Sequence, residues 1–191
     1  MINSRQFLDA FKSEWKLNEN RDDIPEMYTL KRDWTSFMLD KNKGFLVNVM
    51  RRLSKQGEKL EYRSFYTIDA MYVSGDLYKD ECRYPSTLHA LIEHENGDYI
   101  EEEMWKMLFW RAPLKVIIFY DWDEHEKKTE TKLNWLTNKL RALGTMRTEA
   151  LKFYPEDDMA QYLFIVGNRK EKNRPPEWRY AACGELTARP L

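Results

Sequence analysis

Seven consecutive residues give the strongest strand signal in the chain: Leu114-Lys115-Val116-Ile117-Ile118-Phe119-Tyr120. After Lys115 the stretch is apolar throughout, which is typical of a strand covered on both faces of a sheet. A second run of this kind, at 162–166, indicates another buried strand. Segments with helical periodicity surround both runs. The sequence therefore predicts an α/β sandwich, in which helices pack against a central mixed β-sheet.

The remaining elements are expected from the spacing of apolar residues and from turn-forming residues. Helices are expected over about 4–16, from Thr29 or Asp33 onward, over 45–57, over 101–112 and over 129–143. Ser4 is expected to cap the first helix, and Gly57, Pro113 and Gly144 are expected to end later ones. The polar segment 18–25 is expected to be a loop. Further strands are expected over 60–73 with a turn at 74–76, over 86–96 and over 178–183.

The length of 191 residues is enough for one substantial core and short of what two ordinary domains need. Residues 1–191 are therefore expected to form a single domain. Its helical part is 1–57, and 58–191 is a sheet-containing core that ends in a basic hairpin. No apolar run approaches the roughly 18 residues of a membrane span, and the N-terminus lacks the apolar run of a signal peptide. A cytoplasmic protein that does not engage a membrane is expected.

Several functional classes lack their motifs in this chain. Two cysteines and three histidines, without CxxC or HxxxH spacing, argue against a disulfide framework and a structural zinc site. Dinucleotide-binding, P-loop, serine-hydrolase and HExxH motifs are also absent. Hydrophobic residues make up 42% and charged residues 33% of the chain, a globular composition. The formal net charge of −1 means that any contact with nucleic acid must come from a local basic patch.

Three acidic residues interrupt two apolar strands: Asp69 in the strand 60–73, and Glu93 and Glu95 in the strand 86–96. Because side chains alternate between the two faces of a strand, Glu93 and Glu95 are expected on one face and His94 on the other. A carboxylate among apolar residues is costly to bury unless it is paired or bound to a metal. If the two strands pair, Asp69 and Glu93 would share a divalent cation, and Glu95 would hold a second one or orient a water molecule. Mg²⁺ and Mn²⁺ prefer such oxygen ligands and support phosphodiester hydrolysis.

The order of these features resembles the PD-(D/E)XK nuclease superfamily. The matching segments are Asp69, Glu93-His94-Glu95, the helix 101–112 and the strand 114–120, so the resemblance covers roughly 59–120. It implies a restriction-endonuclease-like fold, binding of Mg²⁺ or Mn²⁺ by the carboxylates, and cleavage of DNA or sometimes RNA. Many such nucleases are dimers, so a homodimer is compatible with the resemblance.

The chain departs from the pattern of the superfamily at two positions. Ile68 precedes Asp69 where a proline is usual, and Glu95 stands where a lysine is commonest. If a lysine is still needed to position water or to stabilise the transition state, Lys106 on the following helix is the nearest candidate. The superfamily also includes members with an acid on the first helix, for which Glu14 is the candidate here.

Each candidate residue also has a purely structural interpretation. Glu93 and Glu95 would be the solvent-facing side of an edge strand, and Asp69 would pair with a structural arginine or lysine. His94 is expected to be a hydrogen-bonded core histidine rather than a metal ligand. Asp121 and His125 follow the strand 114–120 in an acidic segment, which is either a solvated loop or a cation site.

A basic segment near the C-terminus is the candidate contact for nucleic acid: Arg169, Lys170, Lys172 and Arg174, followed by Trp178. Basic residues beside an aromatic ring can follow a phosphate backbone, although such a segment is also an ordinary solvated loop. The leading hypothesis is a metal-dependent endonuclease that acts on nucleic acid, in the first place DNA. The alternative is a non-catalytic protein of the same fold that binds a nucleic acid or a protein. The missing lysine and the near-neutral charge favour that alternative.

Overall fold

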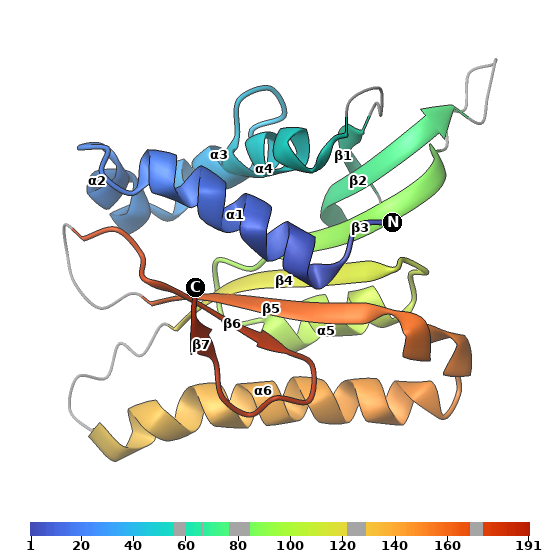
Figure 1. Cartoon of the computed structure of the whole chain (residues 1–191). Coiled ribbons are helices and arrows are strands. Elements are labelled where there is room, and N and C mark those ends of the chain that lie inside the picture. Colours follow the sequence, from blue (N-terminus) through green and yellow to red (C-terminus); the bar gives the residue numbers. More distant parts are fainter. Residues whose placement is uncertain (56–59, 66, 77–84, 122–128, 169–173) are drawn as a thin grey trace.

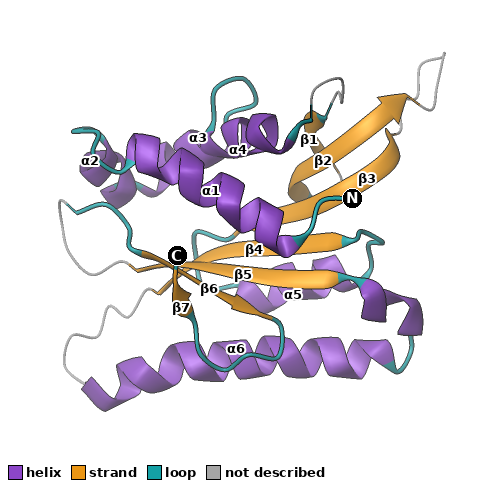
Figure 2. Cartoon of the chain, viewed as in Figure 1, coloured by secondary structure: helices purple, strands orange, loops and turns teal. Residues whose placement is uncertain are grey.

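The computed structural model describes residues 1–55, 60–65, 67–76, 85–121, 129–168 and 174–191. These residues form a seven-stranded mixed sheet with helices on both of its faces (Figure 1, Figure 2). The expectation of an α/β protein with a central mixed sheet is therefore confirmed. No helix among the described residues combines the length and the apolar character needed to cross a membrane.

The helices are α1 (Ser4–Asn18), α2 (Ile24–Thr29), α3 (Lys31–Leu39), α4 (Phe45–Leu53), α5 (Ile100–Leu108), α6 (Thr129–Leu151) and the short 3-10 helix η1 (Pro155–Met159). The strands are β1 (Glu61–Phe65), β2 (Ile68–Asp76), β3 (Pro85–His94), β4 (Leu114–Asp121), β5 (Gln161–Asn168), β6 (Trp178–Ala182) and β7 (Arg189–Pro190). They lie in the sheet in chain order. β1, β2 and β3 are antiparallel, β3, β4 and β5 are parallel, and β6 and β7 are antiparallel again.

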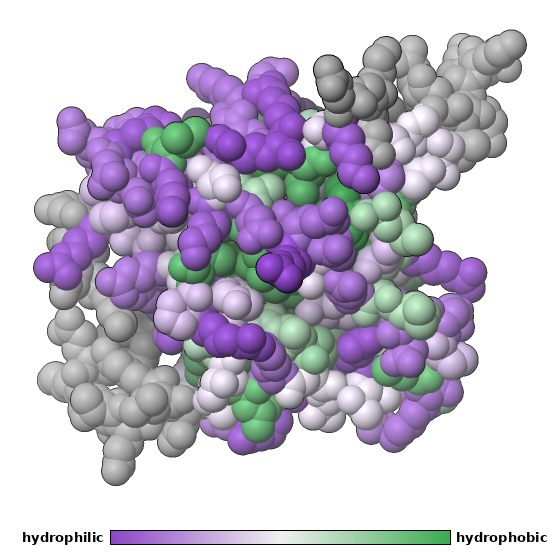
Figure 3. All heavy atoms as spheres, viewed as in Figure 1, coloured by the Kyte–Doolittle hydropathy of each residue, from purple (hydrophilic) through white to green (hydrophobic). Residues whose placement is uncertain are grey.

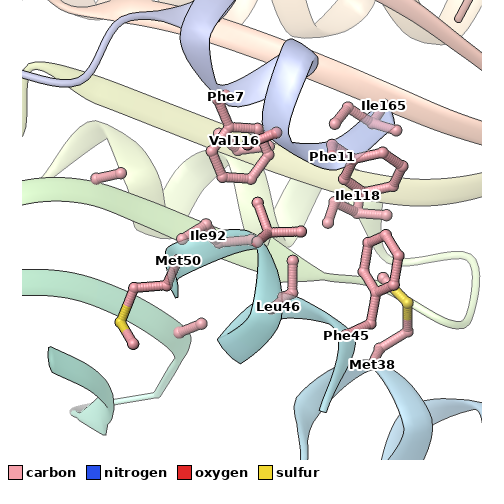
Figure 4. Close-up of a cluster of buried hydrophobic side chains, with 14 of the residues drawn as sticks. Phe7, Phe11, Met38, Phe45, Leu46, Met50, Ile92, Val116, Ile118 and Ile165 are labelled. Carbon is pink, nitrogen blue, oxygen red and sulfur yellow. The ribbon is translucent and has the colours of Figure 1, made fainter. Parts of the chain in front are cut away.

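Each face of the sheet carries its own hydrophobic core. The helices α1 to α4 cover one face, where Phe7, Phe11 and Phe45 pack toward Ile92 and Ile118 (Figure 4). The helices α5 and α6 make the two parallel crossovers and cover the opposite face. As a result β4 and β5 are buried along nearly their whole length, as the apolar runs 114–120 and 162–166 predict.

Lys115 interrupts the apolar run of β4 and is fully buried. Its Nζ donates to Asp157 Oδ1 in η1 at 2.5 Å and to the Tyr162 hydroxyl at 2.8 Å. Burial lowers the pKa of Lys115, and the bond to Asp157 opposes this effect. The buried charge is thus paired, as a buried lysine requires, and the pair holds η1 against the sheet.

The N-terminal helices begin and end differently from what the sequence predicts. Asn3, not Ser4, caps α1, because the Asn3 side chain accepts the N–H of Gln6 while the Gln6 side chain accepts the N–H of Asn3. The segment 18–25 is a loop only in part, because α1 continues to Asn18 and α2 begins at Ile24.

Three later helices also differ in where they end. α4 ends at Leu53, because the next residue, Ser54, adopts an extended conformation. Gly57, which was expected to end this helix, lies outside the described residues. α5 ends at Leu108, several residues before Pro113. α6 continues through Gly144 to Leu151, so this glycine does not end the helix. A helical glycine costs only about 1 kcal/mol, which packing readily offsets.

The stretch 60–73 forms two strands rather than one. Phe65 pairs with Ile68 across a tight reversal, in which Thr67 has a φ of 67°. Neither glycine nor proline marks this turn, so the sequence pattern does not predict it. The turn expected at 74–76 lies within β2 instead, where Ser74 pairs with Thr87 of β3.

Candidate functional site

The candidate site is built where β2 begins and β3 ends. The two strands pair with Ala70 opposite Ile92, so Asp69 and Glu93 face each other at the end of the ladder. The backbone N–H of Asp69 donates to Glu93 Oε2 at 3.1 Å, and Asp69 Oδ2 accepts the backbone N–H of His94 at 2.9 Å. The expected pairing of the two strands is confirmed, and it brings the two acids together.

The side chain of Lys106, from α5, lies beside Glu93. Its Nζ lies 3.0 Å from Glu93 Oε1 and contacts Glu103 Oε2, one helical turn earlier. It also donates to the Thr67 carbonyl oxygen at 3.2 Å. The strained left-handed conformation of Thr67 places that carbonyl at the turn beside the acids. The structure thus brings Lys106, the lysine selected from the sequence, into contact with Glu93.

Glu103 belongs to this group of charges, and the sequence pattern explained it differently. The run 101–103 is favourable at the start of a helix because acids there interact well with the helix dipole. Glu103, however, turns inward beside Lys106, with a side chain only 12% exposed. The one signal in the sequence is its three-residue spacing from Lys106, which places both on neighbouring helix positions. We call Asp69, Glu93, Glu95, Glu103 and Lys106 the acid cluster.

Burial decreases from the centre of the acid cluster to its edge. Glu93 is fully buried, Lys106 has a side chain 21% exposed, and Asp69 and Glu95 are half-buried. Glu93 is therefore not the solvent-facing side of an edge strand. Among the described residues no arginine forms an ion pair with Asp69, and the lysine of the cluster contacts Glu93 rather than Asp69.

The pKa values of three carboxyl groups in the acid cluster are raised, because the groups are buried close to one another. Burial, together with the charges of Asp69 and Glu103, raises the pKa of Glu93 to about 9, and Lys106 opposes the shift. Burial also raises the pKa of Asp69. The pKa of Glu95 is raised by burial and then by the charge of Glu103. Either a proton on one of the carboxyl groups or a bound cation would relieve this crowding of negative charge.

Side chains of the acid cluster offer a chemically suitable but unassembled set of metal ligands. Glu93 Oε1 and Glu103 Oε2 are buried, and in the described part of the chain both contact the ammonium group of Lys106. Carboxylate oxygens are the ligands that Mg²⁺ and Mn²⁺ prefer. Within the described ranges, however, no three acidic, histidine or cysteine side chains are already arranged around a common metal position. Lys106 lies between the acids, so a metal would have to displace its ammonium group from Glu93.

His94 points to the opposite face of the sheet and belongs to the core. Its Nε2 lies 2.7 Å from the Tyr120 hydroxyl, which accepts the indole N–H of Trp34 at 2.5 Å. The Tyr120 hydroxyl and His94 Nε2 are hydrogen-bonded, and which of them donates depends on the tautomer of the imidazole. Burial lowers the pKa of His94 to about 3. The interpretation of His94 as a bonded core histidine is confirmed.

The other candidate residues lie elsewhere or outside the described residues. Asp121 pairs with Arg179 at 2.9 Å, which accounts for its charge without a cation. Glu14 pairs with Arg52 at 2.8 Å on the face covered by α1 to α4, so it is not part of the acid cluster. Arg174 is exposed. His125 and three of the predicted nucleic-acid contacts lie outside the described residues: Arg169, Lys170 and Lys172.

Comparisons with protein-family models, with curated proteins and with solved structures each give no match.

Proposed function

We propose that this protein is a metal-dependent nuclease of the PD-(D/E)XK kind, and that the acid cluster is its active site. The observation that carries the proposal is the contact between Asp69 and Glu93 on adjacent strands, with Lys106 at 3.0 Å from Glu93. The order of elements supports it as well, because the two acids are followed by α5 and then by the buried strand β4. Asp69, Glu93 and Lys106 were selected for this chemistry from the sequence alone.

Asp69 and Glu93 would hold Mg²⁺ or Mn²⁺ in this site, with Glu95 as a further ligand. A cation bound there would supply an activated water and neutralise charge on the phosphate oxygens. Glu93 is fixed by the Asp69 N–H, and Asp69 is fixed by the His94 N–H, so both ligands are oriented by the sheet backbone. Such orientation reduces the reorganisation that binding requires.

Lys106 would change partners when the site is occupied. Its contacts with Glu103 and with the Thr67 carbonyl hold the ammonium group beside the acids after Glu93 has been taken by a cation. An ammonium group in that position is suited to contact a phosphodiester oxygen. Glu95, half-buried beyond the end of β3, would orient a water molecule at the edge of the cluster.

The test is cleavage of plasmid DNA and of single-stranded RNA in the presence of Mn²⁺. We expect Asp69→Asn and Glu93→Gln each to reduce the cleavage rate on the order of a hundredfold or more, because the stabilisation that a metal supplies is worth several kcal/mol. Both substitutions keep an oxygen acceptor for the backbone N–H groups, so the fold should be preserved.

Glu101→Gln is the matched control. Glu101 lies in the first turn of α5, as Glu103 does, but it pairs with Lys139 of α6 and not with Lys106. Its cleavage rate should equal that of the unmodified protein. Cleavage that persists at full rate in Asp69→Asn and Glu93→Gln would contradict the assignment of the active site.

A non-catalytic role is the second candidate, and one observation favours it. Lys106 already neutralises part of the acid cluster, and no ready arrangement of three metal ligands exists in the described residues. In that case the cluster would be structural, and the protein would bind a nucleic acid or a protein without cutting it. The absence of Mn²⁺-dependent cleavage of either substrate, in a protein that retains its fold, would favour this second candidate.

A further inference from the structure

A groove of about 610 Å³ lies on the face of the sheet opposite the acid cluster. It is bounded by the N-terminal half of α1, by the C-terminal end of α4 and by residues of the β1 and β3 region. On the side of the molecule seen in Figure 3, most of the surface is hydrophilic, and hydrophobic residues are exposed between the hydrophilic ones. The volume falls in the range of about 300–1,000 Å³ that is usual for small-molecule sites.

Arg52 is a prearranged cationic group in the wall of this groove. Its Nε donates to Glu14 Oε2 at 2.8 Å, and Glu14, only 6% exposed, also accepts from Asn18 Nδ2 at 3.2 Å. Within the described part of the chain, Arg52 forms its hydrogen bond through Nε and not through its two terminal nitrogens. The Arg52 side chain is 36% exposed and lines the groove. A buried acid therefore orients the arginine and leaves its two terminal nitrogens for a ligand.

His89 lines the groove at an irregularity of the sheet. Tyr72 pairs with Ala90 and Val73 pairs with Leu88, so His89 is an extra residue in β3 without a counterpart in β2. Such a bulge changes the direction of a side chain, and bulges are frequent near binding sites. The His89 ring is held by Ser74 Oγ at 2.7 Å from Nε2. A second polar group is thus fixed at the groove.

The residues of the groove select an anion that also has an apolar body and hydrogen-bond donors. Arg52 and Lys55 attract a negative charge, His89 offers an imidazole ring, and Ile2, Leu53 and Leu60 offer apolar surface. Asp9, exposed on the same wall, repels an anion, so the part of the ligand beside it should be a donor such as a hydroxyl or amino group. A simple alkyl anion would leave Asp9 without such a donor. A nucleoside phosphate provides all three features.

We propose that this groove binds a nucleoside phosphate, either free or at the end of a nucleic-acid strand. The phosphate contacts Arg52 and His89, and the base lies against Leu53 and Leu60. This site is independent of the proposed function, because it lies on the other face of the sheet and involves no residue of the acid cluster.

The experiment is a calorimetric titration with adenosine 5′-monophosphate, with inorganic phosphate and with a 5′-phosphorylated oligothymidylate. EDTA is present so that no divalent cation brings phosphate to the acid cluster. The variants are His89→Gln and the double substitution Glu14→Gln/Arg52→Gln, which removes both charges and leaves no unpaired buried carboxylate. Arg51→Gln is the control, because Arg51 directly precedes Arg52 on the same helix but contacts Asn48 and Asn42 instead.

We expect the nucleotide to bind more tightly than inorganic phosphate, and both groove variants to weaken its binding at least tenfold, with Arg51→Gln unchanged. Binding of the oligothymidylate would mean that the ligand of the groove is the phosphorylated end of a nucleic-acid strand. Failure of the oligothymidylate to bind, with the nucleotide bound, would mean that the ligand is a free nucleotide. Equal affinity for nucleotide and inorganic phosphate, binding that the groove variants leave unchanged, or no binding of any of the three probes would overturn the proposal.

Discussion

At the scale of single residues, burial of charge distinguishes the acid cluster from the rest of the surface. The alternation of side chains in a strand predicted that Glu93 and His94 point to opposite faces, and the structure places Glu93 beside α5 and His94 beside Tyr120. Glu103 could not be predicted in the same way. A glutamate in the first turn of a helix is favourable without any partner, and only the packing of α5 on the sheet turns this one inward.

His94 gives a prediction about the pH dependence of stability. An unfolded histidine has a pKa of about 6.5, and burial lowers the pKa of His94 to about 3 in the folded protein. The unfolded state therefore binds more protons between these values. The stabilisation is fully present above the unfolded pKa and is lost as the pH falls toward 3. Between pH 7 and pH 5, His94 should lower the free energy of unfolding by about 2 kcal/mol.

The measurement is urea unfolding at pH 7, 6 and 5 for the unmodified protein and for His94→Gln, whose amide group can still form a hydrogen bond with Tyr120. The substituted protein should lose about 2 kcal/mol less over this range, because the contributions of the carboxyl groups are the same in the two proteins. Equal pH dependence in the two proteins would mean that His94 is not buried in its neutral form.

At the scale of secondary-structure elements, the long apolar strands were predictable and the ends of elements were less so. The strands β4 and β5 are buried on both faces, so their sequences are apolar without interruption except at Lys115. The reversal between β1 and β2 was missed because Thr67 adopts a conformation that glycine usually supplies. The site depends on this turn, since the Thr67 carbonyl accepts from Lys106.

Two glycines within elements should respond in opposite ways to substitution by alanine. A Cβ on Gly144 of α6 would lie 3.6 Å from the Gly184 nitrogen, which is an ordinary contact. Gly144→Ala should therefore stabilise the protein by about 0.5–1 kcal/mol, because alanine favours the helix. A Cβ on Gly167 of β5 would lie 2.7 Å from Tyr120 Cδ1. Tyr120 is fixed by its bonds to Trp34 and His94, so Gly167→Ala should destabilise by about 1–3 kcal/mol.

Thermal unfolding of the two glycine variants is sufficient to check this pair of expectations. A lower melting temperature for Gly144→Ala would mean that α6 is interrupted at that position. An unchanged melting temperature for Gly167→Ala would mean that the Tyr120 ring can move away, contrary to its role in the core.

At the scale of the whole molecule, the sheet separates two polar regions. The acid cluster lies on the face covered by α5 and α6, and the groove lined by Arg52 and His89 lies on the face covered by α1 to α4. The sequence predicted that Asp69 and Glu93 meet in the first region, because these acids stand on apolar strands, where a charge is unusual. It did not predict the second, because the bulge at His89 and the pairing of Glu14 with Arg52 depend on contacts between segments far apart in the chain.

The most direct test of the proposed function is a calorimetric titration with Mn²⁺ of three proteins. These are the unmodified protein, the double variant Asp69→Asn/Glu93→Gln, and Lys106→Met, which removes the cation that a metal must displace from Glu93. We expect the unmodified protein to bind Mn²⁺, the double variant to lose binding, and Lys106→Met to bind more tightly. Binding that persists in the double variant, or that is absent in both other proteins, would contradict a metal site at the acid cluster.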